Sequence, residues 1–470
     1  MKIAIIGAGI AGCAAYLELQ KHLPQPSKSD ESHEVIIYEA YNTSPSITAN
    51  ERKEDHTHSS TLLVGGGLGV APNGLNVLKR LDKELLKDVV RGGYVTAISN
   101  MKNKNGWPLF SMNSASLDDN TNNNNNRPPH MLATSRHSLW TALRGRIPDH
   151  HIIHKRVTQV IARSDGRNSI RFVDNSPIVE ADLVIGADGV RGIAKRALFP
   201  DAKEDPYPRT MSKGLVGVGG FIAAADVKDL VEPGSMNFVF GGNGFFGYFF
   251  SESSVSAGKR DSPYHVSEPG DSLAWWSTYE IEECPDRKTL DMVDVTRQLR
   301  ERHAYWKEPV VKKVIQSLQV ENMYPTWTLP ALPTWERDGV VLVGDAAHAL
   351  PSSSGQGSSQ ALEDVEALAL LLAHYLHALP DEVTPKAQKN AIKAAASQYV
   401  SLRQPHVNAI LESAQKTQNS KREMGILKEY SMYAMMKIMG LFPGFLANQI
   451  RAATEYNIAD DVARIIASDD

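Results

Sequence analysis

The stretch MKIAIIGAGIAG, residues 1–12, determines how the chain begins to fold. Residues 3–6 are apolar and mostly β-branched, which predicts a buried strand. Small and apolar residues then recur at helical spacing over residues 8–23, and residues 35–38 have the composition of a second strand. The stretch therefore opens a strand–helix–strand unit, with a polar insertion at residues 24–34.

Three glycines between this strand and helix have separate physical roles. Gly7 permits a tight turn, Gly9 lets a diphosphate approach the backbone, and Gly12 lets the helix pack closely on the strand. A diphosphate there lies at the positive end of the helix, and Glu39, after the second strand, can accept hydrogen bonds from ribose hydroxyls. A plain turn is the alternative reading. The context favours a dinucleotide site, without deciding between FAD and NAD.

A second block lies far along the chain. Residues 340–348, VVLVGDAAH, form an apolar run that ends in Gly-Asp, and a Gly-rich loop and a helix follow. Such a strand presents a carboxylate at a sheet edge, where it can hold the hydroxyls of a sugar alcohol. The free N–H groups and the dipole at the start of the next helix favour negative charge, such as that on a reduced flavin. An ordinary strand–loop–helix with a capping aspartate is the alternative. The candidate cofactor-binding residues of this block are Asp345, Gly355, Gln356, Gly357 and Ser358.

A third block, residues 181–191 (ADLVIGADGVR), is another apolar strand that ends in Asp-Gly, which a turn alone would also explain. Together and in this order, the three blocks resemble the class A flavoprotein monooxygenases, the family of salicylate hydroxylase-like and para-hydroxybenzoate hydroxylase-like enzymes. The resemblance extends over most of residues 1–375, and the Gly-Asp block is its most specific part. It implies FAD as the cofactor and NADPH or NADH as the co-substrate.

The resemblance also implies roles for individual residues. Asp345 would hold the ribityl chain of FAD, and Asp188 would contribute to FAD and nicotinamide binding. Residues 65–73 resemble the family's loop beside the flavin, which makes Gly66 a candidate. Arg136 matches an arginine, at the start of an Arg-x-x-Leu helix, that contacts FAD in the family.

The Asp-Gly block departs from the family pattern at two positions. Gly192 and Lys195 stand where the family usually has serine and arginine, although Arg196 lies close enough in sequence to substitute. These replacements weaken the prediction that this block contacts the nicotinamide.

The resemblance implies that NAD(P)H reduces FAD and that O₂ then forms a flavin C4a-hydroperoxide, which hydroxylates or epoxidises a small apolar or aromatic substrate. Removal of a phenolic proton would help such a reaction. Tyr248, Arg209 and His348 are conceivable helpers, but the sequence selects no catalytic base, and a structural role suits His348. The substrate wall is expected in the aromatic-rich segment 215–280, where strand alternation sends about half of the side chains to each face. The candidates are Phe221, Phe238, Phe240, Phe246, Tyr248, Phe250, Trp275 and Trp276.

The expected fold class is α/β: a Rossmann-like FAD-binding domain of the glutathione reductase type, interleaved with a smaller β-sheet substrate domain and followed by C-terminal helices. The Met-rich stretch 424–446 is expected to be a helix that covers the substrate domain or forms a dimer contact, rather than a membrane-surface helix. We assign residues 1–75, 130–200 and 335–380 to the FAD-binding domain, 76–129 and 201–334 to the substrate domain, and 381–470 to the helical region.

Composition bears on the other partners. A formal net charge of -4 and a pI near 6.4 give no reason to expect nucleic-acid binding. The chain has only two cysteines and no charged leader, which predicts a cytoplasmic protein. It has no run of about 18 apolar residues, so no membrane span is expected. We expect a monomer or a homodimer. No metal site is expected. Five asparagines at residues 122–126 predict a disordered loop and suggest a fungal enzyme of secondary metabolism.

Four rival functions share parts of this pattern. Residues 327–330 (WTLP) do not match the Trp-x-Trp-x-Ile-Pro signature of flavin halogenases, and no second glycine fingerprint follows a later strand, as a Baeyer–Villiger enzyme of the two-dinucleotide type would need. A plain nicotinamide dehydrogenase would not need the Gly-Asp block. The intact glycine loop at residues 355–357 argues against a non-catalytic binding protein on the same fold.

Overall fold

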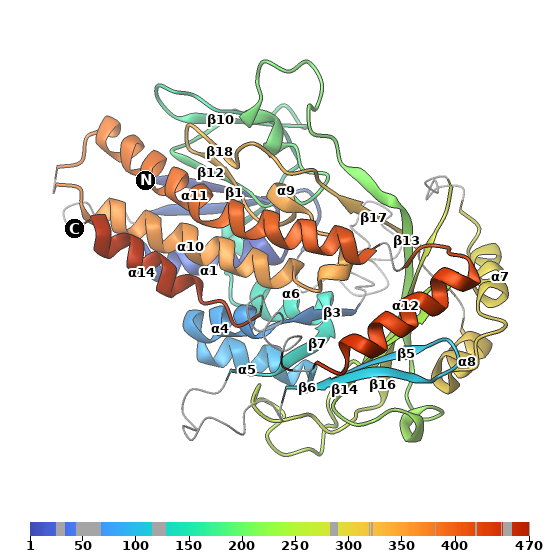
Figure 1. The fold of residues 1–470 in the computed structure, drawn as a ribbon. Coiled ribbons are helices and arrows are strands. Elements are labelled where there is room, and N and C mark those ends of the chain that lie inside the picture. Colours follow the sequence, from blue (N-terminus) through green and yellow to red (C-terminus); the bar gives the residue numbers. More distant parts are fainter. Residues whose placement is uncertain are drawn as a thin grey trace.

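The computed structural model describes most of the chain. The described residues are 1–24, 33–43, 67–114, 128–282, 290–318, 320, 323–380, 382–418, 421–442, 444 and 454–469. The predicted cofactor residue Gly66 and the asparagine run at residues 122–126 lie outside them. The described elements form two parts, one built on a mainly parallel sheet and one on a seven-stranded sheet, with helices from the C-terminal third running from the first toward the second (Figure 1).

The first part is organised by the strand that opens the chain. Residues 3–6 of β1 (Lys2–Ile6) are buried because sheet neighbours flank the strand on both edges and other layers cover both faces. Ile3 pairs with Leu183 on one side and with Val35 on the other, both in parallel. In order across the sheet, the strands are β18 (Glu336–Arg337), β19 (Val340–Leu342), β12 (Leu183–Gly186), β1, β2 (Glu34–Glu39) and β8 (Ile152–His154), with only β18 antiparallel to its neighbour among these described strands.

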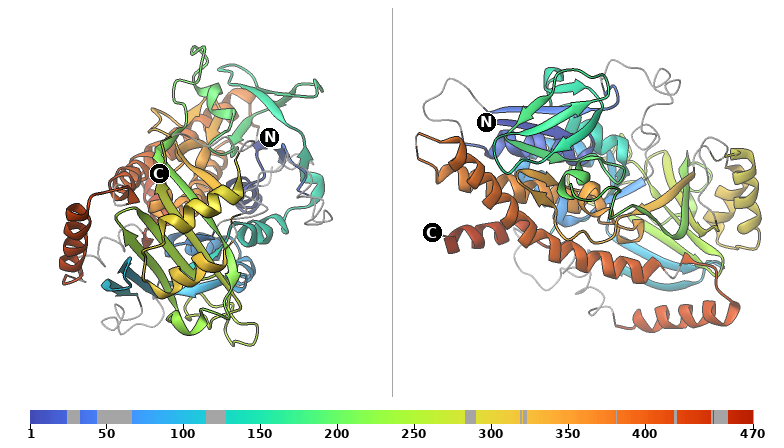
Figure 2. Two further views of the ribbon diagram at one scale, coloured as in Figure 1. Left: turned by 90° about the vertical axis from the view of Figure 1, so that its right-hand side faces the viewer. Right: turned by 90° about the horizontal axis from the view of Figure 1, so that it is seen from above.

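Two different layers cover the parallel sheet. Helices α1 (Ile10–His22) and α10 (Gly357–His377) lie on one face, and a small antiparallel sheet lies on the other (Figure 2). This arrangement is the glutathione reductase-type architecture, and the predicted fold class is confirmed. The strands of the small sheet are β9 (Val157–Ile161), β10 (Asn168–Phe172) and β11 (Val179–Ala181).

Further helices extend the helical layer. Pro72 begins α4 (Pro72–Leu81), where its missing N–H costs no hydrogen bond, and Leu75 and Leu78 enter the apolar core of the parallel sheet. No helix in the described part of the chain has both the length and the apolarity to cross a membrane. The remaining helices here are α5 (Lys83–Arg91), α6 (Arg136–Arg144), α9 (Asp345–His348), α11 (Pro385–Gln418) and α14 (Ile458–Asp469). The short 3₁₀ turns are η2 (Asp149–His151), η3 (Ala194–Leu198), η4 (Lys228–Leu230) and η5 (Ser352–Ser354).

The second part is the aromatic-rich sheet predicted for residues 215–280, extended by strands from either side of that segment. Helices α7 (Met292–Arg302) and α8 (Pro309–Ser317) cover one face, and α12 (Ile426–Met439) packs against the other through Met432 and Tyr433, as expected for a helix that covers this sheet. Its strands, in order, are β17 (Met323–Thr328), β13 (Thr210–Ala223), β16 (Ser272–Glu280), β15 (Gly244–Phe250), β14 (Ser235–Gly241), β5 (Ile98–Asn103) and β6 (Pro108–Asn113).

A three-stranded sheet connects the two parts. It consists of β3 (Gly67–Val70), β7 (Met131–Ser135) and β4 (Gly93–Thr96), with β7 in the middle. Helices α4 and α5 contribute to the apolar core of the parallel sheet and not to that of the seven-stranded one. The sequence had assigned α5 and residues 76–81 of α4 to the substrate domain. The domain boundaries stay a prediction.

A buried cluster of charges joins α9, α10 and α11. The Asp364 carboxylate accepts hydrogen bonds from Gly344 N at 2.9 Å, from His348 Nε2 at 2.5 Å and from Arg403 Nε at 2.9 Å. Arg403 Nη1 also lies 2.8 Å from Glu363 Oε2, and the Arg403 and both carboxylate side chains are fully buried. Burial alone would raise the pKa of Asp364, but His348 and Arg403 hold it at about 2. Burial raises the pKa of Glu363 to about 7 despite Arg403.

Replacing Arg403 by methionine should destabilise the protein by about 3–5 kcal/mol, because Asp364 and Glu363 lose their buried counter-charge. Their pKa values then rise, and a carboxyl with a raised folded-state pKa loses stability as pH increases. The deficit in urea unfolding should therefore be larger at about pH 8 than at about pH 5. Arg297→Met, on the exposed side of α7, is the control and should shift stability by less than about 0.5 kcal/mol. Equal stabilities of the two variants would contradict this account of the cluster.

Candidate active site

The three sequence blocks meet at one edge of the parallel sheet. Strands β1, β12 and β19 are neighbours and run the same way, so the residues that follow them lie together at their carboxyl ends. Ala187 N donates to Ile6 O at 2.9 Å, and Val343 N donates to Gly186 O at 3.0 Å, which fixes the three strand ends side by side. In open α/β sheets this carboxyl edge is where ligands bind.

The glycines after β1 differ in the space around them, and the tight turn at Gly7 and the close packing at Gly12 are as predicted. Gly7 has φ +100°, and a β-carbon on it would lie 2.6 Å from Ala187 O. A β-carbon on Gly12 would lie 1.9 Å from Gly7 O, so the helix and the turn approach too closely for any side chain. By contrast, a β-carbon on Gly9 would meet nothing within 4 Å. Gly9 therefore leaves open space at the start of α1, where no side chain caps the helix.

Glu39 lies beside this open space. Its Oε2 accepts from Ala8 N at 2.6 Å and its Oε1 accepts from Tyr41 N at 3.0 Å. Burial raises the pKa of the Glu39 carboxyl, and the two main-chain donors oppose that shift. The carboxylate is thus fixed at the carboxyl end of β2, next to the glycine turn.

Asp345 begins α9 at the carboxyl end of β19, and its side chain is exposed. Gly344, just before it, has φ +58°, and a β-carbon there would lie 3.2 Å from the Cβ atoms of Ala11 and Ala361. The turn is therefore packed closely between α1 and α10. Asp364 holds both ends of this turn through Gly344 N and His348 Nε2, while the Asp345 carboxylate has no hydrogen-bond or ion-pair partner within the described residues. His348, a weak catalytic candidate, is instead buried in this support.

Asp188 is turned back onto its own chain. Its Oδ2 accepts from Ile193 N at 2.7 Å and from Ala194 N at 3.0 Å, at the start of η3. Burial raises its pKa to about 6, although the main-chain donors of Ala194 and Ile193 act against this. A β-carbon on Gly192 would lie 2.0 Å from Asp188 Oδ1, so a serine there would require the Asp188 side chain to move.

The departure from the family pattern at Lys195 also has a local cause. Lys195 is buried, and its Nζ lies 2.8 Å from Asp205 and donates to Tyr207 O. The charge of Lys195 is therefore balanced by Asp205 inside the protein and does not face the carboxyl edge of the parallel sheet.

The glycine loop at the start of α10 borders the same edge. Gly355 has φ +61°, and neither it nor Gly357 has a neighbour within 4 Å of a β-carbon position. No side chain caps α10, and its first turn contains no acidic residue, so its first N–H groups stay available. Ser358 Oγ donates to Gly69 O at 2.9 Å, which fixes the loop against β3. Gln356 is buried, and its Oε1 accepts a hydrogen bond from Asn73 Nδ2 at 3.4 Å.

Arg136 is the first residue of α6 and is exposed. A cation at the positive end of a helix is electrostatically unfavourable unless an anion lies near it. Ser135 caps the helix by accepting from Ser138 N at 3.0 Å, so Arg136 has no capping role. These features fit contact with an anionic ligand.

The two faces of the seven-stranded sheet divide the aromatic candidates. Phe246, Tyr248, Phe250 and Trp275 pack under α7 and α8, and Phe221 is 40% exposed. The opposite face, called the aromatic face below, meets the sheet that contains β3. A β-carbon on Gly67 would lie 2.5 Å from the Phe249 ring, and one on Gly69 would lie 3.9 Å from Gly355 O. The aromatic face consists of Phe238, Phe240, Phe245, Phe249 and Trp276.

Two members of the aromatic face, Phe245 and Phe249, were not among the sequence candidates. Strand alternation could have found them, since both lie two residues from Gly247, whose missing side chain makes room for Trp276. A β-carbon on Gly247 would lie 2.2 Å from the Trp276 ring.

Tyr248 is directed away from the aromatic face. Its hydroxyl donates to Glu308 Oε1 at 2.7 Å and accepts from Lys102 Nζ at 2.9 Å, beneath α8. Burial and the Glu308 carboxylate raise the pKa of Tyr248. Arg209 lies over the ring of Trp327, with its guanidinium carbon 4.6 Å from the ring centre. Neither residue lies on the aromatic face, so the structure lends them no support as catalytic helpers.

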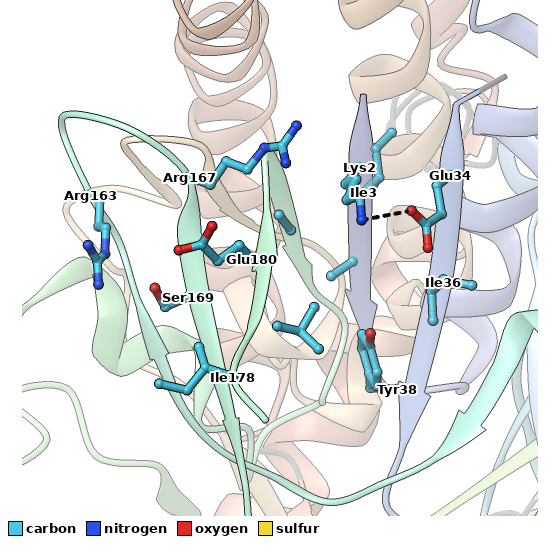
Figure 3. Close-up of a pocket in the computed structure, with 13 residues that line it drawn as sticks. Lys2, Ile3, Glu34, Ile36, Tyr38, Arg163, Arg167, Ser169, Ile178 and Glu180 are labelled. Carbon is cyan, nitrogen blue, oxygen red and sulfur yellow. Dashed lines mark ion pairs between the residues drawn. The ribbon is translucent and has the colours of Figure 1, made fainter. Parts of the chain in front are cut away.

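A separate groove of about 540 Å³ lies between the parallel sheet and the β9–β11 sheet (Figure 3). Lys2 and Glu34 line it at the amino-terminal ends of β1 and β2, with Lys2 Nζ 3.3 Å from the Glu34 carboxylate. The three sequence blocks lie at the opposite ends of these strands. This groove therefore does not belong to the candidate active site.

A glycine turn, an exposed aspartate and a helix N-terminus at the carboxyl edge of this fold define a dinucleotide-binding flavoprotein. A family model described as an FAD binding domain matches residues 151–389, just over half of the chain. The chain belongs to this family of FAD-binding proteins.

Relatives and solved structures agree with this assignment. The FAD-dependent monooxygenase penM of Penicillium crustosum is 22% identical, with 75% of this chain and 69% of the relative covered. The 3-amino-4-hydroxybenzoate 2-monooxygenase of Streptomyces cremeus is 25% identical, with 88% and 86% covered. A salicylate hydroxylase in complex with substrate shares the fold, with a TM-score of 0.69 at 17% identity and 98% and 97% of the two chains covered. The protein is an FAD-dependent monooxygenase.

Replacing Gly12 by alanine should destabilise the protein by at least about 1–3 kcal/mol, because the new methyl group collides with Gly7 O. Without that collision, alanine would stabilise a helix interior by about 1 kcal/mol over glycine, so the sign of the change is informative. Gly258→Ala, where a β-carbon meets nothing within 4 Å, is the control and should be nearly neutral in thermal unfolding. A stabilised Gly12→Ala variant would show that α1 and the turn are less close than described.

Proposed function

We propose that this monooxygenase takes electrons from NADPH or NADH and inserts an oxygen atom from O₂ into a small aromatic or apolar substrate held against the aromatic face. The observation that carries the proposal is the Asp345 carboxylate, which is exposed and unpaired within the described residues at the edge where the glycine turn and the α10 N-terminus also lie. A solvent-facing acid fixed by a buried support is well suited to accept hydrogen bonds from a bound polyol.

The residues at this edge fit the separate parts of FAD. The open space at Gly9 and the uncapped start of α1 suit the diphosphate, and Glu39 suits the adenosine ribose. In the same assignment, Asp345 holds the ribityl hydroxyls and Arg136 pairs with a phosphate. Asp188 instead shapes the edge by capping η3. The further cofactor residues in this proposal are Gly7, Gly12, Gly355, Gln356, Gly357 and Ser358.

Bound FAD supplies the electron transfer and the activation of O₂. The chain provides the electrostatic setting, because the first N–H groups and the dipole of the 21-residue helix α10 favour negative charge on the flavin ring. Gly355 and Gly357 keep side chains away from these N–H groups. The loop is kept in place by Ser358 and by Ser359, whose Oγ accepts from Ala71 N at 3.0 Å.

The aromatic face holds the substrate and excludes water. Phe249 and Trp276 lie nearest to β3, with their ring centres 5.7 Å apart. Ring contacts orient a flat substrate, and the apolar surroundings keep water from the reacting atoms. Aromatic side chains and apolar surroundings therefore favour small aromatic substrates. A role in secondary metabolism is part of the same proposal, and the relative from Penicillium crustosum supports a fungal setting.

Replacing Asp345 by alanine should leave the protein folded but weaken FAD binding about 10- to 100-fold, because hydrogen bonds to the charged carboxylate are lost. The flavin content after purification and the dissociation constant from fluorescence titration are the measurements. Asp229→Ala, an exposed acid in η4, is the matched control and should keep its flavin. Full flavin occupancy in the Asp345→Ala variant would refute the role given to Asp345.

The co-substrate and the substrate can be identified together by anaerobic stopped-flow reduction of the bound FAD. NADPH and NADH are compared, each with and without a panel of phenols, indoles and aromatic acids. One nicotinamide should reduce the flavin faster, and a substrate should accelerate that reduction. If neither nicotinamide reduces the flavin under any of these conditions, the proposed electron source is wrong.

A further inference from the structure

Helix α12 carries apolar side chains on two opposite sides, and the described part of the protein covers only one of them. On the covered side, Met432 and Tyr433 pack on the aromatic face of the seven-stranded sheet, and the buried Glu429 pairs with Lys104. This packing accounts for the covering role that the sequence predicted. A helix that is apolar on both sides is normally buried on both sides, so the outer side of α12 needs a second partner.

The outer side of α12 is apolar and exposed. Leu427 is 88% exposed and Ile438 is 58% exposed, and two further exposed apolar residues follow the end of the helix. Figure 2 shows α12 at the outer edge of the molecule, with the sheet on one side of it and no other described element on the opposite side. An exposed apolar surface of this kind marks contact with another protein or with a membrane. We call it the outer patch, and it consists of Leu427, Tyr430, Met435, Ile438, Leu441 and Phe442.

Two lysines lie at the borders of the outer patch. At about 100° per residue, Lys428 and Lys437 fall about 90° to either side of the direction in which Leu427 and Ile438 point. Both lysines are exposed, and neither forms an ion pair within the described residues. The apolar surface therefore has a positive charge along each of its long borders.

No acid on the neighbouring elements balances these lysines. Glu429 is buried against Lys104, and Glu423, just before α12, lies 2.7 Å from Arg302. Strand β6, which packs next to the end of α12, contains no charged residue. Among the described residues, the outer patch is thus bordered by positive charge alone, although the whole chain has a formal net charge of -4.

The charges distinguish between the two kinds of partner. In a twofold dimer the same patch meets itself, and a patch bordered only by lysines offers no opposite charge to its copy. An anionic lipid surface does offer it. Lysines beside an apolar face can extend their ammonium groups to the headgroups while the apolar side chains enter the boundary of the acyl chains.

We propose that the outer patch of α12 docks the protein on the surface of a membrane that contains anionic lipids. The 14 residues of α12 extend about 21 Å, which is too short to cross a bilayer core, so the helix lies flat in the interface. Leu427 and Ile438 point into the membrane, and Lys428 and Lys437 contact the headgroups on either side of the helix.

Co-sedimentation with sucrose-loaded vesicles tests the proposal on the full chain with FAD bound. The vesicles contain phosphatidylcholine alone or phosphatidylcholine mixed with phosphatidylserine. The protein should bind the mixed vesicles about tenfold or more tightly than phosphatidylcholine alone, because each lysine near the surface adds electrostatic attraction to anionic lipid. Binding to the mixed vesicles should weaken as the salt concentration rises.

Two double variants separate the apolar and the electrostatic parts of the patch. Leu427→Ser with Ile438→Ser should weaken binding to the mixed vesicles at least about tenfold, because the buried apolar area is lost. Lys428→Gln with Lys437→Gln should weaken it about tenfold and remove the preference for phosphatidylserine. All four side chains are exposed, so both variants should keep the thermal unfolding of the unaltered protein.

Matched controls lie on α7 and α8, which cover the opposite face of the same sheet. Val293→Ser replaces an apolar side chain that is as exposed as those of the outer patch, and Lys312→Gln with Lys313→Gln removes two exposed lysines. These controls should bind the mixed vesicles as tightly as the unaltered protein does.

The proposal is overturned if the unaltered protein does not bind the mixed vesicles, or if the Leu427→Ser, Ile438→Ser variant binds them equally well. It is also overturned if ultracentrifugation without lipid shows a dimer that this variant dissociates, since a second copy then covers the patch. The inference does not rest on the proposed function. Flavin content and reduction by NAD(P)H should be unchanged in every α12 variant, so a failure of either proposal leaves the other to be judged separately.

Discussion

The candidate active site depends on the bonds of one buried carboxylate. Asp364 accepts from Gly344 N and His348 Nε2, and so fixes both ends of the turn that presents Asp345. Arg403 makes this possible because it balances the charge of Asp364 and Glu363 in the interior. Holding the turn and binding a ligand are therefore done by two different acids, because one carboxylate could not do both. Asp364 supplies rigidity inside the protein, while Asp345 stays exposed and able to bind a ligand.

On the seven-stranded sheet, strand alternation places two sets of side chains on opposite faces, and the two sets have different roles. One set of side chains, including Tyr248 and Phe246, packs against α7 and α8 and anchors the sheet. The other set, including Phe249 and Trp276, faces the three-stranded sheet and the glycine loop before α10.

The backbone geometry of the candidate site could be predicted from the sequence where it depends on neighbouring residues. Gly7, Gly9 and Gly12 act through backbone space within a single turn, and the structure gives each the environment that its spacing predicted. Contacts between distant segments could not be predicted in this way. The hydrogen bonds of Asp188 to the start of η3 depend on how the chain folds back after β12, and the buried position of Lys195 depends on Asp205. For the same reason, nothing in the local pattern around Arg403 indicates that this residue is buried.

The central claim is that the carboxyl ends of β1, β2 and β19 together hold one FAD molecule whose flavin ring faces the aromatic wall. A crystal structure of the protein grown with FAD is its most direct test. The account predicts the diphosphate at Gly9, the ribityl chain at Asp345 and the flavin ring between the loop before α10 and Phe249. Density for FAD in the groove between the parallel sheet and the β9–β11 sheet, or a diphosphate bound away from Gly9, would contradict it.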